Sequence, residues 1–441
     1  MACDRNDCTP CDATADISAP PSPEAAKSSG AHFWRNVLLF YTSDSLAAVA
    51  TAVVSVQTVV AVLLQQAGFA NVILGLSMAT STIGVCLTQV PAAFWASRAR
   101  HKGRWLTWLR VAESLPRLVA VVGAFLLAPS RPWATAFLLF MPLFAGSLLL
   151  GANRPVRAEL DGRLVPHTRR GRYYGAMMVA QVGLGMLGAA LARSLLAQIP
   201  DRGGYAACFA AAAAFGIASA IPFSFLPEPE NGDSKKQGRF LDYFHGLTSL
   251  IGADRNYRNF LWGRALVGIG HMAQGFFAVY ALERFHLPAK TAPLFTIPAL
   301  VGQAMGSFLW GYVGDKKGHR LVQLAMCVQS GLAPLLALVA PNAWVFALVF
   351  WMNGMAYASD FVSTNNFLLE SAPDHDMMGY VSFANSLIAP TFALSSVLGG
   401  AIADLTSFRL LFFLSVLIWV GGFWVMAARV RDPRAVKRPA A

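Results

Sequence analysis

The sequence predicts an all-α polytopic membrane protein with twelve transmembrane helices in two six-helix pseudo-symmetric bundles. Of its 441 residues, 56% are hydrophobic and 13% are charged, whereas soluble proteins carry about 25% charged residues. The charges fall in short groups, and the apolar stretches between them are roughly 20 residues long, which is enough to cross a ~30 Å hydrocarbon core as a helix. An internal repeat, described below, divides these stretches into two equal sets.

The longest polar interval lies in the middle of the chain and separates six expected helices from six others. We therefore expect a disordered tail over 1–32, a six-helix bundle over 33–226, a cytoplasmic linker over 227–258, a second six-helix bundle over 259–428 and a basic tail over 429–441. The expected helices are 36–65, 70–95, 105–128, 133–156, 173–198, 205–226, 259–283, 290–313, 320–340, 342–370, 379–404 and 407–428.

Lys and Arg concentrate in alternate loops, and this asymmetry predicts the orientation in the membrane. One set of loops is rich in them, near residues 98–104, 154–172, 235–258, 316–320 and 429–438, whereas the other set holds Arg131, Arg202, Arg284, Lys290 and Arg409. Both termini are therefore expected to be cytoplasmic in a multi-pass protein of the cytoplasmic (inner) membrane. The first 30 residues lack an apolar segment, so the first span is expected to act as an uncleaved anchor.

The net charge of +12 is explained by this loop asymmetry, because the basic residues form no patch or motif typical of nucleic-acid binding. Of the six cysteines, Cys3, Cys8 and Cys11 have the C-x4-C-x2-C spacing that begins a plant-type iron–sulfur site. The fourth ligand is missing. Metal or thiol chemistry in this tail and a merely solvated tail both stay open, and we expect no cofactor and no metal elsewhere.

The two halves of the sequence repeat one another, as the halves of many transporters do. When Trp95–Leu109 is placed over Trp310–Leu324, the Trp, a Lys-Gly pair and two Leu match without a gap. Similar pairs, such as "RNVL" from Arg35 and "RNFL" from Arg258, keep the same order. The halves therefore read as parallel six-helix repeats.

The stretch "WGYVGDKKGHR" (Trp310–Arg320) concentrates glycines and charges between the eighth and ninth expected helices. Its first two glycines, Gly311 and Gly314, are expected to allow close helix approach, and Gly318 the positive φ of a tight turn. A carboxylate at Asp315 suits the N-terminus of a neighbouring helix. The basic residues that hold this loop in the cytoplasm and can pair with carboxylates across the interface are Lys316, Lys317 and Arg320.

This stretch resembles the G-x-L-A-D-[RK]-x-G-[RK]-[RK] loop motif of the major facilitator superfamily. Val313, Gly314 and His319 are conservative departures from it. The resemblance covers about residues 33–430 and implies that the loop packs against the eleventh helix and helps to hold an outward-facing state. It also implies that Asp315 caps the start of that helix near Gly379 and Tyr380. The local patterns "RNVLLFYTSDSL", "VSVQTV" and "ESLPR" are similar to an uncharacterised bacterial branch of the superfamily.

The corresponding loop of the first half is less complete. It keeps Lys102, Gly103 and Arg104, but Arg100 stands where the second half has its acid, so the equivalent cap is in doubt. We expect a compensating pair between Glu159 and Arg104, mirrored in the second half by a pair between Glu370 and Arg320.

Ionisable residues inside spans cost ~2.5 to 3.5 kcal/mol on insertion scales, so each should face the bundle interior and is a candidate functional residue. Asp44 is the first candidate for protonation or substrate contact, the alternative being a structural partner for an arginine. Arg110, Glu113 and Arg117 are spaced to form an ion-pair ladder along one helix face; the alternative is that Glu113 and Arg117 face the cavity as part of a substrate or proton site. The remaining candidates for a substrate or proton site are Thr58, Gln89, Arg264, His271, Gln274, Gln303, Asn353 and Asp360.

Together these features predict a secondary active transporter that moves a small solute by alternating access, rather than an enzyme. No nucleotide-binding motif is present, so an ion or solute gradient would drive it. Proton coupling is favoured by Asp44, Asp360 and His271. A non-transporting receptor or accessory subunit, a lipid flippase and a membrane enzyme are the alternatives. The expected partners are a small solute, protons and the bilayer, for a monomeric protein.

Overall fold

The structure is a computed structural model that describes residues 23–96, 101–125, 132–164, 170–226, 254–371 and 377–433. These residues form long helices with short connections and contain no strand. In the first half the helices are α1 (Pro23–Val53), η1 (Val56–Val60), α2 (Ala61–Gln66), α3 (Asn71–Ala96), α4 (Lys102–Phe125), α5 (Pro132–Leu164), α6 (Arg170–Gln198), α7 (Asp201–Ala218) and α8 (Ile221–Ser224).

In the second half the helices are α10 (Arg255–Gly270), η3 (His271–Phe276), α11 (Phe277–Phe285), η4 (Ala289–Phe295), α12 (Thr296–Lys317), α13 (His319–Val339), α14 (Ala343–Ser371), α15 (Met377–Leu405) and α16 (Phe408–Arg429). Within the described residues, eleven helical segments are long and apolar enough to cross a membrane. The helix α4 is not among them, because Arg110, Glu113 and Arg117 interrupt its apolar sequence. It nevertheless packs against α5 and α7 inside the bundle, so it takes the place of the third expected helix, 105–128.

The structure corrects several expected helix limits. The first expected helix is broken after Val53 and continues through the π-helix η1, and the seventh changes to a 3-10 helix at His271. The fourth runs to Leu164, so its basic end is helical rather than a loop. The helix α12 continues to Lys317, which reduces the expected turn before α13 to Gly318 alone.

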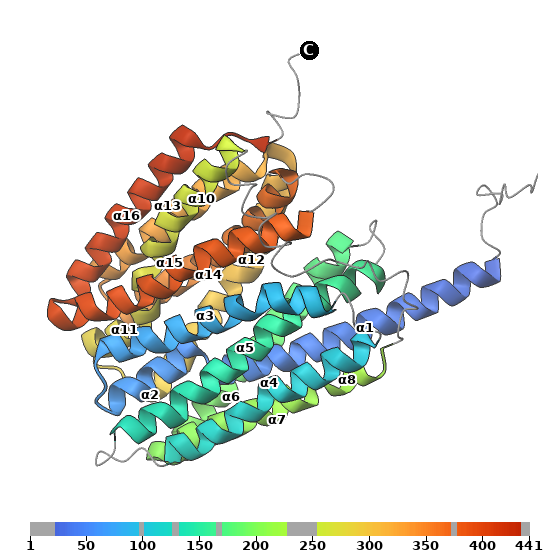
Figure 1. Ribbon diagram of the computed structural model, residues 1–441. Helices are drawn as coiled ribbons and strands as arrows, with labels where there is room; N and C mark the ends of the chain where they lie inside the picture. Colours follow the sequence, from blue (N-terminus) through green and yellow to red (C-terminus); the bar gives the residue numbers. More distant parts are fainter. Residues whose placement is uncertain are drawn as a thin grey trace, which may run out of the picture.

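Helix pairs in the two halves repeat one another. The pair α3 and α5 corresponds to α12 and α14, and α4 with α7 corresponds to α13 with α16. Between the halves, α3 packs against α15 and α6 against α12, again a matched pair of contacts (Figure 1). The structure therefore has the internal symmetry that a parallel repeat of helices produces.

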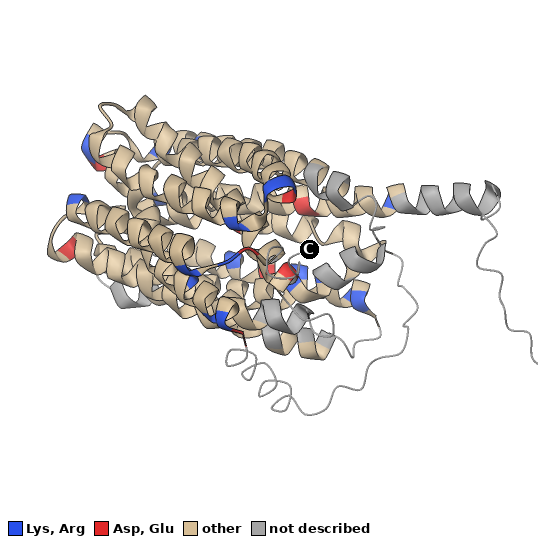
Figure 2. Cartoon of the chain, turned by 90° about the horizontal axis from the view of Figure 1, so that it is seen from above, with Lys and Arg blue, Asp and Glu red and all other residues tan. Residues whose placement is uncertain are grey.

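The bundle has two ends, which we name by their loops. The basic face is the end where α1 starts and α16 ends, and it holds the turn at Gly318; the opposite face is the end with α2, α11 and the α15–α16 turn (Figure 1). Between these ends most of the helical surface carries neither Lys, Arg, Asp nor Glu (Figure 2). A surface of this kind suits the hydrocarbon core of a bilayer.

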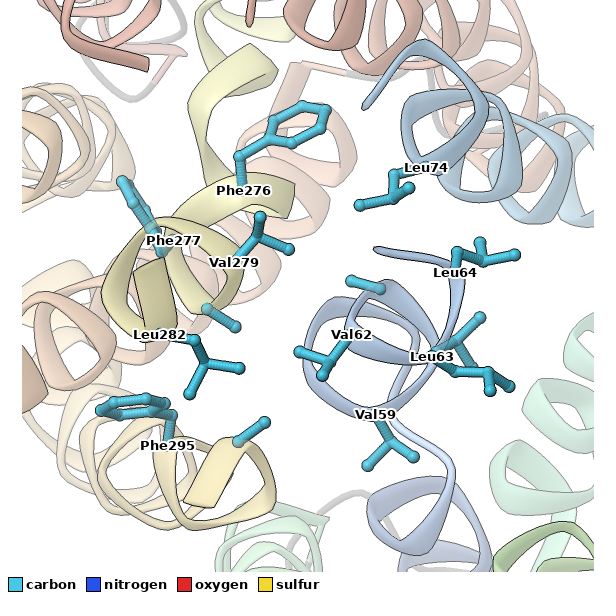
Figure 3. Packing of buried hydrophobic residues seen from close by; sticks show 14 of the residues in the cluster. Val59, Val62, Leu63, Leu64, Leu74, Phe276, Phe277, Val279, Leu282 and Phe295 are labelled. Atoms are coloured by element: carbon cyan, nitrogen blue, oxygen red, sulfur yellow. The ribbon is translucent and has the colours of Figure 1, made fainter. Parts of the chain in front are cut away.

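The hydrophobic core is organised differently at the two faces. Near the basic face each half has its own cluster, one around Phe40 and Phe223 and the other around Phe260 and Phe367. Near the opposite face a single larger cluster contains residues of both halves. In it, Val59 and Val62 of the first half lie across from residues of α11 and η4 such as Val279, Leu282 and Phe295 (Figure 3). Apolar burial therefore joins the two halves at the opposite face.

Candidate functional site

Asp44 of α1 lies between two guanidinium groups inside the first half. Its Oδ1 accepts a hydrogen bond from Arg110 of α4 at 3.2 Å, and its Oδ2 lies 2.7 Å from Nη2 of Arg157 on α5. Arg157 also donates to Oδ1 at 3.1 Å. The side chains of Asp44, Arg110 and Arg157 are only 12%, 11% and 13% exposed. Removing one partner of a buried contact of this kind strongly destabilises the protein, because it leaves an uncompensated charge in the interior.

The position of Arg157 is fixed by aromatic side chains as well as by Asp44. Its guanidinium lies 4.0 Å from the centre of the Phe40 ring and donates to the hydroxyl of Tyr173 at 3.0 Å. Tyr41 in turn donates to the carbonyl of Tyr173 at 2.8 Å. These contacts connect α1, α5 and α6 around one cation. Sequence reasoning had counted Arg157 only as a cytoplasmic loop charge.

The ion pairs continue along α4. Glu113 lies 3.5 Å from both Arg110 and Arg117, at the i+3 and i+4 spacings of one helix face. The first half therefore buries a network of two carboxylates and three guanidiniums that links α1, α4 and α5. Arg117 lies beside α7, since a methyl group added at Gly216 would be 2.6 Å from its Nη1.

The second half holds a corresponding pair with the charges exchanged. Arg264 of α10 donates twice to Asp360 of α14, at 2.5 and 3.1 Å. Thr364 donates to Asp360 Oδ1 at 2.7 Å, and Gln323 of α13 donates to Thr364 at 2.7 Å. The Arg264 side chain is 6% exposed and the Asp360 side chain 21%. In the first half the acid is on the first helix of the repeat and the base on the fourth, whereas here the first helix carries the base.

His271 begins the 3-10 segment of the seventh span. Its Nδ1 is 2.8 Å from the carbonyl of Val267, which can only accept, so this nitrogen carries the proton. The ring lies 4.6 Å from that of Phe392 and 4.8 Å from that of Trp419. In a 3-10 helix residues i and i+3 eclipse, so Gln274 shares the face of His271.

The neutral candidates are spread over several helices. Thr58 is buried, and its hydroxyl lies 3.1 Å from that of Thr296 in the other half. Asn353 is buried in α14, whereas Gln89 of α3 and Gln303 of α12 are half-buried. Thr58 therefore joins the two halves, and within the described residues no hydrogen bond links Thr58, Gln89, Gln303 and Asn353 to one another.

The glycines of the loop motif differ in their surroundings. Gly318 has φ +90°, and a Cβ there would lie 2.2 Å from Oδ2 of Asp432. A Cβ at Gly314 would meet the ring of His319 at 2.6 Å. Gly311 has open space around it, so the expected close helix approach there is wrong. In α12 it is Gly302 and Gly306, further from the loop, that lie against the backbone of α14.

The expected pair between Glu370 and Arg320 is also wrong. Glu370 lies 3.6 Å from Nε2 of His319, whereas Arg320 donates to the carbonyl of Ala427 at 2.6 Å. The reason is geometric: consecutive residues of a helix point about 100° apart, so His319 faces α14 and Arg320 faces α16.

The rest of the predicted latch is described only in part. Lys102 and Gly103 are buried and Arg104 is exposed. Lys316 lies over the ring of Tyr312, 4.4 Å from its centre. Arg100, Cys3, Cys8 and Cys11 lie outside the described residues, as do the side chains of Glu159 and Tyr380 and the surroundings of Gly379. The expected cap by Asp315 and the expected pair of Glu159 with Arg104 therefore stay predictions.

Comparison with known proteins finds one family that the second half of the chain resembles. Residues 260–441 match the family model described as Major Facilitator Superfamily. An uncharacterised transporter of this type from Bacillus subtilis, YfkF, is 30% identical over 125 residues, which cover 28% of this chain and 31% of the relative. The second half of the chain is thus similar to the major facilitator superfamily. A second relative, mouse solute carrier family 22 member 6, is 27% identical over 104 residues, which cover 24% of this chain and 18% of that protein. The chain thus aligns with about a third or less of the length of these curated relatives.

Solved structures of transporters share the fold over nearly the whole chain. The crystal structure of a D-xylose-proton symporter has a TM-score of 0.71 at 14% identity and covers 91% of this chain and 99% of its own. A bacterial homologue of the lysosomal transporter Spinster, in an inward-facing and occupied conformation, has a TM-score of 0.69 at 13% identity, with 93% and 99% covered. The predicted all-α, multi-pass membrane fold is therefore confirmed. The relative from Bacillus subtilis and these solved structures are described as transporters.

Proposed function

We propose that the chain is a member of the superfamily and a secondary active transporter that moves a small solute across the cytoplasmic membrane by alternating access. The observation that carries the proposal is the unequal joining of the halves. They share one apolar core at the opposite face and keep separate cores at the basic face. Rocking one rigid half against the other would open the shared core and bring the separate ends together, which is how repeat-built transporters alternate.

The orientation follows from the loop charges. Lys and Arg favour cytoplasmic loops, so the basic face would be cytoplasmic, with both termini there, and the opposite face external. The arrangement of the cores then corresponds to a state closed to the outside. A solute site would lie between the halves near the bilayer midplane, as in other transporters built from repeats.

The proposal includes proton coupling, with Asp360 as the group that exchanges the proton. Protonating Asp44 would leave the three guanidiniums of its network with Glu113 as their one carboxylate, an excess of two positive charges. Protonating Asp360 leaves an excess of one positive charge, on Arg264, and Asp360 is the more exposed of the two acids. Its neighbours are Arg264, the hydroxyl of Thr364 and, in the same span as Arg264, His271 of η3. The charge balance therefore favours Asp360 over Asp44, the first candidate from the sequence.

The test begins with a thermal-shift screen of purified protein against a solute library. Each stabilising solute is then assayed in proteoliposomes, first for exchange without a gradient and then for accumulation with a proton gradient. We expect one chemical class to stabilise the protein and to be exchanged. If no solute binds or exchanges, the transporter proposal fails in favour of a receptor or accessory subunit; movement of a labelled phospholipid instead would indicate a flippase.

Coupling is tested with Asp360→Asn in the same proteoliposomes. We expect exchange to persist and gradient-driven accumulation to be lost. The double variant Asp360→Asn with Arg264→Gln restores the local charge balance, so it separates loss of coupling from loss of folding. Accumulation that survives in both variants would rule out Asp360 as the coupling group.

A further inference from the structure

Asp404 of α15 joins the two halves at the opposite face, because its side chain binds the N-terminal end of α3. It lies in the last turn of α15, at the surface. Its Oδ1 accepts hydrogen bonds from the backbone N–H of Asn71 at 2.8 Å and from the Asn71 side-chain amide at 2.9 Å, while Oδ2 accepts from the N–H of Val72 at 2.8 Å. These donors are the first residues of α3. One carboxylate of the second half thus caps a helix of the first half.

The position of this acid is unfavourable for its own helix. The C-terminus of a helix carries partial negative charge, whereas its N-terminus attracts anions. A carboxylate in the last turn of α15 is therefore disfavoured by α15 and stabilised by α3. The first N–H groups of a helix have no partner within it, so the contact also satisfies donors that α3 cannot satisfy itself.

The backbones around the cap leave no room between the two helices. A Cβ at Gly400 would lie 2.3 Å from the carbonyl oxygen of Asn71, and one at Gly75 would lie 2.1 Å from the carbonyl oxygen of Ser396. Two further contacts between the halves lie at this face, Thr58 with Thr296 and Gln65 with Glu283. Opening the opposite face would therefore have to break the Asp404 cap, because the cap sits on the pair of helices that holds the halves together there.

We infer that Asp404 is a latch for the state closed at the opposite face. Asp315 is expected to cap a helix in the same way at the basic face and to favour the outward-facing state. The Asp404 cap instead favours the state that is closed at the opposite face. The inference rests on the proposed alternating access, and it assigns to Asp404 the positioning of the two halves rather than contact with a solute. Loss of the latch shifts the equilibrium towards opening at the opposite face.

The experiment measures access to the interface between the halves. Thr58→Cys is introduced in a protein whose six native cysteines are replaced by alanine, because Thr58 is buried between the halves at the opposite face. The rate of labelling by a membrane-impermeant maleimide, added from the side of the opposite face, is compared with and without Asp404→Asn. We expect labelling to become faster by about twofold to fivefold, the size of a charge-to-helix-end interaction at the surface.

Asp254→Asn is the matched control. Asp254 also caps a helix N-terminus, accepting from Asn256 N at 2.7 Å and Tyr257 N at 3.1 Å, but both acid and helix belong to the second half. It should leave the labelling rate unchanged. Equal rates in the two Asn variants, or labelling in neither, would overturn the latch. Because the assay reports opening and not flux, a latch without transport would contradict the proposed function alone.

Discussion

At the residue scale, the charged side chains inside the helices are distributed as one network in each half. Asp44, Arg110 and Arg157 join three helices of the first half, and Arg264 with Asp360 joins two helices of the second. Each contact is buried, so its net contribution to stability is small while the cost of breaking it is large. The networks therefore fix how helices pack within a half.

Replacement of Arg157 by glutamine should destabilise the protein strongly. It removes the bidentate contact with Asp44 and the cation over Phe40, and breaking a buried pair costs about 3–5 kcal/mol. Thermal unfolding in detergent measures the effect. Arg409→Gln is the control, because Arg409 is exposed, and it should leave the unfolding temperature unchanged. Equal losses in the two variants would mean that the Arg157 contacts contribute nothing specific.

The hydroxyl of Thr364 should matter more than most hydroxyls in this protein. It donates to Asp360 and accepts from Gln323, which is buried. Thr364→Val leaves the Gln323 amide without this acceptor, at a cost of about 1–3 kcal/mol. Thr51→Val is the comparison: Thr51 is exposed and its hydroxyl bonds to the carbonyl of Ala47 in its own helix. The same unfolding assay should separate the two variants; a loss in Thr51→Val as large as that in Thr364→Val would contradict the argument.

At the scale of helices, close crossings depend on a few glycines. In the α12–α14 crossing, a Cβ at Gly302 would lie 2.0 Å from the carbonyl of Trp351, and one at Gly354 would lie 1.8 Å from that of Ala299. The obstacles are backbone atoms, so the two helices would have to separate. Small residues serve this purpose in membrane helices.

Gly302→Ala should therefore destabilise the protein by about 1–3 kcal/mol, the usual cost of overpacking. Gly183→Ala should instead be neutral or stabilising, because Gly183 is helical with nothing within 4 Å of an added Cβ and alanine is the better helix former by roughly 0.5–1 kcal/mol. Thermal unfolding distinguishes the two outcomes. A stable Gly302→Ala variant would show that α12 and α14 can move apart at no cost.

At the scale of the whole molecule, the two kinds of core make a further prediction. Val62 is buried in the cluster shared by both halves, whereas Val37 is buried in the cluster of the first half alone. Replacing either by alanine should lower the free energy of unfolding by no more than about 1.5–3 kcal/mol. Only Val62→Ala should also speed maleimide labelling of Thr58→Cys. If both variants sped labelling equally, the shared core would not be what closes the opposite face.

Much of the architecture was predictable from the sequence, and some of the site was not. Apolar length, the Lys and Arg loops and the repeat predicted the membrane helices. The role of Arg157 was missed because it lies in a basic stretch of the kind that marks a cytoplasmic loop. In the structure α5 extends to Leu164, and this extension brings Arg157 into the bundle. Asp404 was missed because an acid at a helix end resembles an ordinary loop residue until its partner helix is known.

The sequence by itself determined that this is a multi-pass helical protein, because hydrocarbon thickness sets the length of an apolar helix and backbone groups must be satisfied within it. Only the tertiary structure decided which charges meet. Asp44 and Arg157 lie 113 residues apart in the chain and Asp404 and Asn71 lie 333 apart, and periodicity along one helix says nothing about a partner on another. The separation of the cores, and with it the closed face, is likewise a property of packed helices and not of any one of them.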